Sequence, residues 1–211
     1  RAALERSGVE GGQIGQVFLG HVINTEPRDM YVSRVAALDA GIPDSAGAMN
    51  VNRLCGSGAQ AIASAFQVLS LGDCDFALAG GVENMSRSPY ALTSARWGQK
   101  MGDARAIDMM TGALTCPFGT GHMGVTAELV AAENRISRAD QDAFALESQA
   151  RAARAIADGR FRKEIAPVEI GTRKGTVFFD TDDNNSADQA IYLIGVTKDN
   201  LEDLGANFTI V

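Results

Sequence analysis

Histidine and cysteine are scarce in this sequence of 211 residues, which contains two His and three Cys. The cysteines, at positions 55, 74 and 116, are odd in number and form no C-x-x-C pair, which argues against a disulfide framework and against a metal site. Because free thiols are typical of a reducing compartment, we expect a cytoplasmic protein. Any Cys–His catalytic pair must use His21, His122 or a residue outside this sequence.

Positive charge and long apolar runs are also lacking. Lys and Arg number 19 against 26 Asp and Glu, so the net charge is -7 and offers no basic surface for a phosphate backbone. Glycine, serine or charged residues interrupt the apolar runs before the roughly 18 residues of a membrane span. Neither nucleic acid nor a membrane is therefore an expected partner. The hydrophobic content of 45% is typical of a folded domain and excludes disorder.

Short apolar segments alternate with segments of helical spacing in the first half. Strands are predicted over residues 16–23, 46–52 and 74–81, and helices over residues 30–40 and 57–71. The opening residues 1–8 are typical of the last turns of a helix closed by Gly8. Strands that alternate with helices pair in parallel, so the sequence predicts an α/β fold with a mostly parallel sheet covered by helices.

The pattern changes after the third predicted strand. Residues 82–122 are too long for an ordinary connection and predict an inserted loop domain that faces substrate or forms an interface. Helices are predicted over 124–134 and 137–159, with Ser137 as N-cap, and a hairpin over 165–180 around Arg173-Lys-Gly175. We therefore divide the chain into an α/β part (1–81), a loop region with the following helices (82–183) and a tail (184–211).

The most informative segment is Val51-Asn-Arg-Leu-Cys55-Gly-Ser-Gly58, which places a thiol where a strand turns into a helix. Unpaired amides and the positive end of the helix dipole would favour the thiolate there, and Gly56 and Gly58 would let a substrate approach closely. This predicts that Cys55 is a nucleophile. The alternative is a small core residue, since free cysteine is often buried. Cys74 is most simply a packing residue, and no motif supports Cys116 as a catalyst.

Three ordered motifs resemble those of the thiolase family. The segment from Asn52 through Cys55-Gly-Ser-Gly58 resembles the family's nucleophile motif. Gly80-Gly-Val-Glu-Asn-Met-Ser86 is similar to its Gly-Gly-x-Glu-x-Met-Ser segment, and Gly121-His-Met-Gly-Val-Thr-Ala-Glu128 to its His-Met-Gly-x-Thr-Ala-Glu segment. The resemblance covers about residues 1–183 and is to the N-terminal half plus loop domain of bacterial beta-ketothiolases of the acetyl-CoA acetyltransferase type.

The resemblance implies an acyltransferase with a thiolase-like fold. Cys55 would hold the acyl group as a thioester, with its backbone amide in an oxyanion hole. Leu114, His122 and Met123 match positions that line the pantetheine tunnel and substrate pocket in the family; for His122, a hydrogen-bonded structural role is the alternative. The implied partners are acyl-CoA and coenzyme A, which are substrates rather than cofactors, and the implied assembly is a homodimer or homotetramer.

Several family features are missing from this sequence. In the family, an activating His in a Gly-His-Pro context and an acid/base Cys in a Cys-x-Gly context come from the second half of the subunit, and neither context occurs here. We therefore expect a truncated chain that is inactive when isolated. By simple register Ser186 replaces a basic residue that meets the nucleotide phosphate, and the tail matches the family poorly. The alternatives are a non-catalytic acyl-CoA or lipid binding module and a structural fragment.

Overall fold

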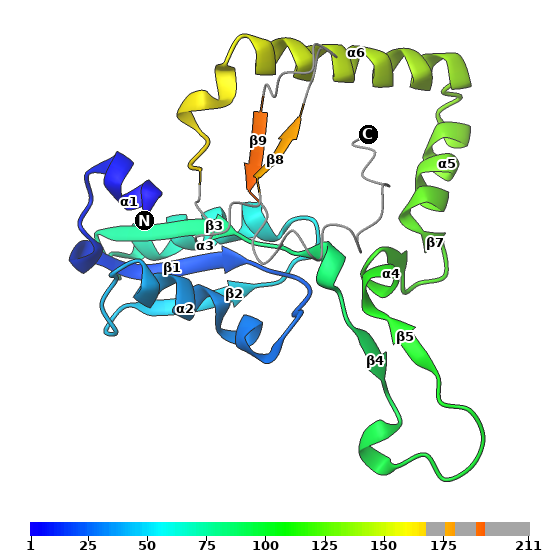
Figure 1. Ribbon diagram of the computed structural model, residues 1–211, viewed down its shortest axis with the longest axis horizontal. Coiled ribbons are helices and arrows are strands. Elements are labelled where there is room, and N and C mark those ends of the chain that lie inside the picture. The colour runs from blue at the N-terminus through cyan, green and yellow to red at the C-terminus, as the bar shows by residue number, and fades with distance from the viewer. Residues whose placement is uncertain (168–175, 180–188, 193–211) are drawn as a thin grey trace. The chain divides into compact units, whose positions relative to one another are not determined.

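The computed structural model describes residues 1–167, 176–179 and 189–192 (Figure 1). The chain forms two compact units, Arg1–Arg135 and Ile136–Val211, and each is described by itself. The division at residue 135 falls inside the region predicted as 82–183. The predicted domain boundaries remain predictions.

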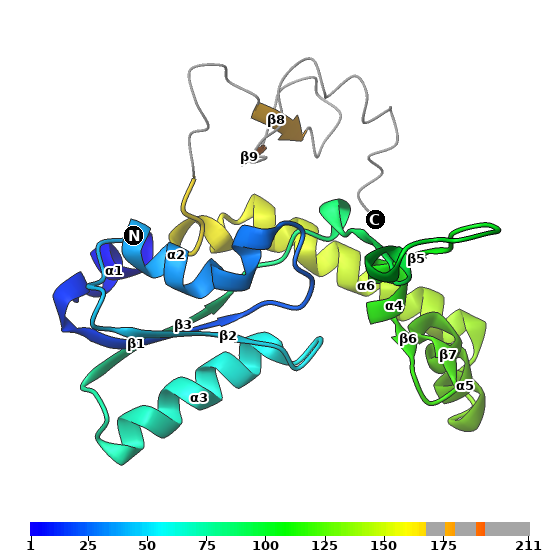
Figure 2. The ribbon, with the colours of Figure 1, turned by 90° about the horizontal axis from the view of Figure 1, so that it is seen from below.

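A three-stranded parallel sheet organises the first unit. Its strands are β1 (Ile14–Gly20), β2 (Gly47–Val51) and β3 (Phe76–Gly81), in the order β2-β1-β3. Helices α1 (Ala2–Ser7) and α2 (Val32–Asp39) cover one face, and α3 (Ser57–Leu71) covers the other (Figure 2). This confirms the predicted α/β fold with a parallel sheet between helices.

The core lies on both faces of β1, because successive side chains of a strand point to opposite sides. Val17 belongs to the cluster under α1 and α2, and its neighbour Phe18 packs against Ala61 and Ala65 of α3. Burial on both faces explains why this strand is a nearly continuous apolar run in the sequence. The first cluster consists of Leu4, Ile14, Val17, Ala37, Ile42 and Ala46.

The boundaries of the predicted elements move by a few residues. The helix predicted over 57–71 is α3, with the same bounds. The helix predicted over 30–40 divides into a 3-10 helix, Pro27–Tyr31, and α2, because Pro27 sets the first turn and the Asp29 carboxylate accepts the amide of Thr25 at 2.7 Å. The predicted closure by Gly8 is also observed, since Gly8 is left-handed with a φ of 70°. Another 3-10 helix, Gly11–Gln13, leads into β1.

One window of the sequence contradicts the expectation drawn from interrupted apolar runs. Leu54–Leu71 is long and apolar enough to cross a membrane by length and composition alone. Core helices of globular proteins meet the same criterion, and α3 places Ala61 and Ala65 against the sheet. Only 17% of the window is buried, so α3 has one face against the sheet and exposes apolar side chains such as Ile62 and Phe66 on the other.

The predicted loop region contains two small antiparallel sheets. In the first, β4 (Tyr90–Leu92) pairs with β5 (Ala106–Asp108); in the second, β6 (Thr115–Cys116) pairs with β7 (Gly121–His122). Helices α4 (Met109–Ala113) and α5 (Met123–Glu133) complete the region, with 3-10 turns at Met85–Arg87 and Ala95–Trp97. The sequence predicted an inserted loop region here, but it did not predict these two short pairs of antiparallel strands.

The described part of the second unit is a long helix, a 3-10 turn and a pair of strands. Helix α6 (Arg138–Ala157) begins with the predicted N-cap at Ser137. The Ser137 side chain accepts the amide of Asp140, and the Asp140 side chain accepts the amide of Ser137, which together form a capping box. The 3-10 turn Arg160–Lys163 follows, and β8 (Thr176–Phe179) pairs antiparallel with β9 (Gln189–Tyr192). The predicted hairpin turn 173–175 and Ser186 lie outside the described residues.

Candidate active site

The carboxyl ends of the three parallel strands meet at one edge of the sheet. Gly20 of β1 is level with Val51 of β2 and with Gly81 of β3. Backbone hydrogen bonds continue past the strand ends, from the His21 amide to the Val51 carbonyl (3.0 Å) and from the Val82 amide to the Gly20 carbonyl (2.9 Å). Ligand sites of open parallel sheets form at such an edge.

The turn that carries Cys55 is held by the side chain of Ser57. This buried hydroxyl accepts the amide of Arg53 at 2.9 Å and donates to the carbonyl of Leu54 at 2.6 Å. Asn52 adds a second brace, because its Oδ1 accepts the amide of Leu54 at 3.1 Å. The thiol of Cys55 itself is exposed. The turn therefore fixes the backbone on both sides of the sulfur and presents the sulfur outward.

Two backbone features make this turn sharp. Leu54 has a φ of 47°, a left-handed conformation that is unfavourable for a residue with a branched side chain and that clusters at functional sites. Gly20 lets the start of α3 lie against β1, because a Cβ there would be 2.8 Å from the carbonyl carbon of Ser57 and 2.9 Å from the amide nitrogen of Gly58. Gly20 was not predicted as a site residue. A glycine inside the apolar run predicted as a strand was the available signal, since such a glycine suggests a close approach of another backbone segment.

Cys55 opens onto a pocket of about 230 Å³. Its walls come from the segment after β1, the turn that carries Cys55, the segment after β3 and helix α4. The lining residues are Val22, Ile23, Leu54, Cys55, Glu83, Met85, Met110, Ala113 and Leu114. The lining is mainly aliphatic, with a thiol and a carboxylate as its ionisable groups. A pocket of this volume suits a short acyl chain, since sites for whole ligands span about 300–1,000 Å³.

The predicted substrate-binding residues are close in the chain but differ in their relation to this pocket. Leu114 lines it. The amide of Met123 donates to the Leu114 carbonyl at 2.9 Å, and His122 is paired with Thr115 in the β6–β7 ladder. His122 and Met123 are thus connected to Leu114 through the backbone, but they are not part of the pocket lining. The roles assigned to these residues remain predictions.

His122 also has a structural contact that matches its alternative interpretation. Its Nδ1 accepts the amide of Gly124 at 3.1 Å, which caps the start of α5. Because Nδ1 is the acceptor, the ring proton lies on Nε2, and the exposed ring can donate from that atom. The cap and a substrate contact through Nε2 are compatible.

Glu83 and His21 were not predicted as site residues, although Glu83 lies in one of the motifs. The Glu83 carboxylate accepts the amides of Val22 at 2.9 Å and Ile23 at 3.1 Å. The buried His21 ring contacts the Val82 carbonyl through Nδ1 at 2.9 Å; a carbonyl only accepts, so Nδ1 carries the proton. No local pattern could reveal these contacts, which join residues 60 or 61 positions apart.

The other two cysteines occupy different surroundings. Cys74 is half-buried and packs closely against Gly15 of β1: a Cβ added at Gly15 would lie only 2.5 Å from the Cys74 Cβ. This close contact fits the predicted role of Cys74 as a packing residue. Cys116 is half-buried in the β6–β7 hairpin. A hydrogen bond from the Thr120 side chain, followed by bonds from the amides of Phe118 and Thr120, lowers the pKa of the Cys116 thiol.

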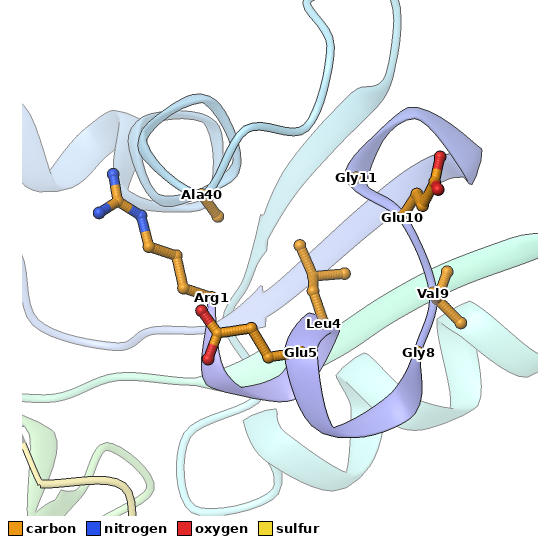
Figure 3. Close-up of a pocket in the computed structure, with 8 residues that line it drawn as sticks. All are labelled: Arg1, Leu4, Glu5, Gly8, Val9, Glu10, Gly11 and Ala40. Carbon is orange, nitrogen blue, oxygen red and sulfur yellow. The ribbon is translucent and has the colours of Figure 1, made fainter.

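A second pocket, of about 410 Å³, opens beside α1 and the end of α2 (Figure 3). Figure 3 shows the carboxylates of Glu5 and Glu10 on different sides of Leu4, so they do not converge on a common point. This pocket contains none of the predicted site residues. Within the part of the chain that the structure describes, no group of three or more His, Cys, Asp or Glu side chains could hold a metal ion.

Comparison with known sequences agrees with the motifs. The family profile described as "Thiolase, N-terminal domain" matches residues 1–205, which extends beyond residue 183, where the motif resemblance ends. The beta-ketothiolase BktB of Cupriavidus necator is 56% identical over 191 residues, or 90% of this chain and 48% of that protein. The acetyl-CoA acetyltransferase of Pseudomonas aeruginosa is 40% identical over 200 residues, or 94% of this chain and 51% of that protein. The chain spans about half the length of the curated relatives it matches.

Solved structures give the same result for the fold. The Bacillus anthracis acetyl-CoA acetyltransferase superposes with a TM-score of 0.78 at 40% identity, over 89% of this chain and 47% of that chain. Human mitochondrial 3-ketoacyl-CoA thiolase in complex with CoA superposes with a TM-score of 0.77 at 36% identity, over 80% of this chain and 43% of that chain.

Proposed function

The chain belongs to the thiolase family, and on that premise we propose that it supplies the nucleophile of an acyltransferase that condenses acyl-CoA molecules or thiolyses 3-oxoacyl-CoA. The observation that carries this proposal is the exposed thiol of Cys55, held by a braced turn at the mouth of an apolar pocket on the carboxyl edge of a parallel sheet.

Condensation proceeds in two steps through Cys55. Its sulfur attacks the thioester carbonyl of the first acyl-CoA; a carbon–sulfur bond to Cys55 forms, the bond to coenzyme A breaks, and the thiol proton is transferred to the leaving coenzyme A. The second acyl-CoA then loses an α proton to a base, and its carbanion attacks the acyl carbon. Cys55 leaves and regains a proton. Thiolysis is the reverse sequence.

We assign the acid/base groups of these steps to the half of the relatives' length that this chain does not cover. Neither described histidine is placed to activate the thiol from the pocket lining: His21 bonds the Val82 carbonyl through Nδ1, and His122 caps α5. Coenzyme A thioesters act as substrates, and no separate cofactor enters the proposal. The human 3-ketoacyl-CoA thiolase, whose solved structure is a complex with CoA, supports coenzyme A as the ligand class.

Leu114 is proposed to contact the acyl group, and His122 and Met123 to line the entry for the pantetheine arm. The position of Leu114 in the pocket lining supports the first assignment. The backbone bond between Met123 and Leu114 supports the second, because it keeps the start of α5 beside the pocket wall.

We further propose that the protein is a cytoplasmic homodimer or homotetramer. Three free thiols fit a reducing compartment. The β4–β5 hairpin and its connection expose large apolar side chains, which favours contact with a second copy: Tyr90, Leu92, Trp97 and Met101.

The decisive experiment uses the full-length protein. Incubation with acetyl-CoA, acid quench and peptide mapping should find one acetyl group on the peptide that contains Cys55, and initial rates should follow ping-pong kinetics. Binding of acetyl-CoA without an acyl-enzyme would instead favour the non-catalytic binding module. Sequential kinetics would contradict a covalent intermediate.

A further inference from the structure

One wall of the Cys55 pocket is an irregular segment with no strand or helix to fix it. Val22 and Ile23 follow β1, after the sheet ladder has ended at Gly20, and both line the pocket. Ile23 is 8% exposed, so its side chain is packed rather than free to move aside. The position of this wall depends on the hydrogen bonds that its backbone makes.

Glu83 provides two of those bonds from the neighbouring strand end. Its Oε2 accepts the amide of Val22 and its Oε1 accepts the amide of Ile23, at 2.9 and 3.1 Å. Asn52, which braces the Cys55 turn, donates from Nδ2 to the Val22 carbonyl at 3.4 Å. The wall is therefore fixed from both sides, and the carboxylate makes the shorter contacts.

The Glu83 carboxylate offers a separate oxygen to each of the two amides. A carboxamide has one oxygen, so one amide would face an NH₂ group that also donates. An aspartate is shorter by one methylene and cannot span the same two contacts without a backbone shift. Glu83 also lies beside the buried His21 ring, with Nδ1 and Oε1 3.6 Å apart, although its own side chain is 30% exposed. Its position is therefore set by these polar contacts rather than by packing.

We propose that Glu83 is a positioning residue that limits the length of the acyl group accepted at Cys55, by holding the Val22–Ile23 wall against the pocket. The inference rests on the proposed function and deepens it, because it names the group that sets substrate selectivity. Glu83 acts through the wall, because its carboxylate bonds the amides of Val22 and Ile23.

The test compares two alkylating probes on the full chain. Iodoacetamide carries no alkyl chain and can alkylate Cys55 without filling the pocket. N-hexyl iodoacetamide must place its six-carbon chain in the pocket to react. Rates at Cys55 are read by peptide mapping, which separates them from rates at Cys74 and Cys116. The variants are Glu83→Gln, Glu83→Asp and Ile23→Ala, with Glu133→Gln as a matched control that removes an exposed carboxylate on α5 outside the pocket lining.

The expected result is a change in selectivity. In Glu83→Gln the ratio of the hexyl rate to the iodoacetamide rate should rise about threefold to tenfold, the size expected when about one more methylene group is buried. The ratio cancels any change in the reactivity of the sulfur itself, and the Glu133→Gln ratio should stay at the wild-type value. Ile23→Ala should raise the ratio in the same direction, and the double variant Ile23→Ala/Glu83→Gln should show less than the product of the two effects.

Three results would overturn the proposal: an unchanged ratio in both Glu83 variants, an equal fall of both rates, or loss of the cooperative thermal transition in both variants. The last would make Glu83 a determinant of the fold rather than of selectivity. Because an exposed thiol alkylates without turnover, these ratios are measurable even if no acyl-enzyme forms. Failure of the proposed function and failure of this inference are therefore distinguishable.

Discussion

The turn that holds Cys55 and the hairpin that holds Cys116 use hydrogen bonds in opposite ways. Around Cys55, the side chains of Ser57 and Asn52 bond the backbone and leave the sulfur at the pocket. Around Cys116, the Thr120 hydroxyl and nearby amides bond the sulfur, which lowers the pKa of that thiol. A sulfur that accepts such bonds is more often ionised but less nucleophilic as a thiolate. A low thiol pKa therefore does not by itself locate the nucleophile.

The strongest test of this contrast removes each sulfur in turn. In the full-length protein, Cys55→Ala should lower acetoacetyl-CoA thiolysis by about a thousandfold or more, because the covalent step loses its nucleophile. Cys116→Ala is the matched control and should retain activity within about twofold. Initial rates at saturating coenzyme A measure both. Comparable losses in the two variants would refute the distinction between the cysteines.

The next largest effect is expected at Gly20, which lets the Cys55 turn lie against β1. Gly20→Ala should lower the free energy of unfolding by about 1–3 kcal/mol, because the new Cβ meets the backbone of Ser57 and Gly58. Gly12→Ala is the control, since a Cβ there has nothing within 4 Å. Urea unfolding midpoints give the comparison. Equal midpoints for the two variants would show that the close approach has no energetic consequence.

Removal of the Ser57 hydroxyl should have a smaller effect on stability. Ser57→Ala leaves the Arg53 amide and the Leu54 carbonyl without their side-chain partner, at a cost of about 1–2 kcal/mol. Cys55 alkylation should also change, because the turn that presents the sulfur loosens. Ser70→Ala, at an exposed position of the same helix, is the control for thermal unfolding. A Ser57→Ala protein with wild-type stability and alkylation rate would contradict the bracing role.

The smallest effect is expected at Thr120, and it concerns pH. Thr120→Val removes the hydroxyl that stabilises the Cys116 thiolate, so the pKa of Cys116 should rise toward its ordinary value. The pH–rate profile for alkylation of Cys116 should move to higher pH, while that of Cys55 stays in place. Since a lowered folded-state pKa contributes its full stability only above the ordinary thiol pKa, any loss of stability should appear at alkaline pH and vanish as the pH falls.

The sequence predicted those parts of the molecule that local patterns encode. The apolar runs indicated the parallel sheet, and Ser57–Leu71 is a helix with the predicted bounds. The position of Cys55 between β2 and α3 followed from the same pattern. The caps at Ser137 and Gly8 were also readable, because a capping side chain and a left-handed glycine act within a few residues.

The features that could not be predicted depend on contacts between distant residues. Glu83 reaches Val22 and Ile23 only because β1 and β3 are neighbours in register, a pairing that spans 60 or 61 residues. The role of Gly20 depends on how closely α3 approaches the sheet. The small ladders β4–β5 and β6–β7 involve two or three residue pairs each, which is too short for an alternating pattern to be recognised.

Limiting alkylation tests most directly whether Cys55 is the reactive thiol. The full-length protein is treated at neutral pH with less than one equivalent of iodoacetamide, and the alkylated fraction of each cysteine peptide is measured. We expect Cys55 to be labelled first, ahead of Cys116 with its lowered pKa and of Cys74 with its packed side chain. Labelling of Cys116 or Cys74 before Cys55 would contradict the assignment of Cys55 as the nucleophile.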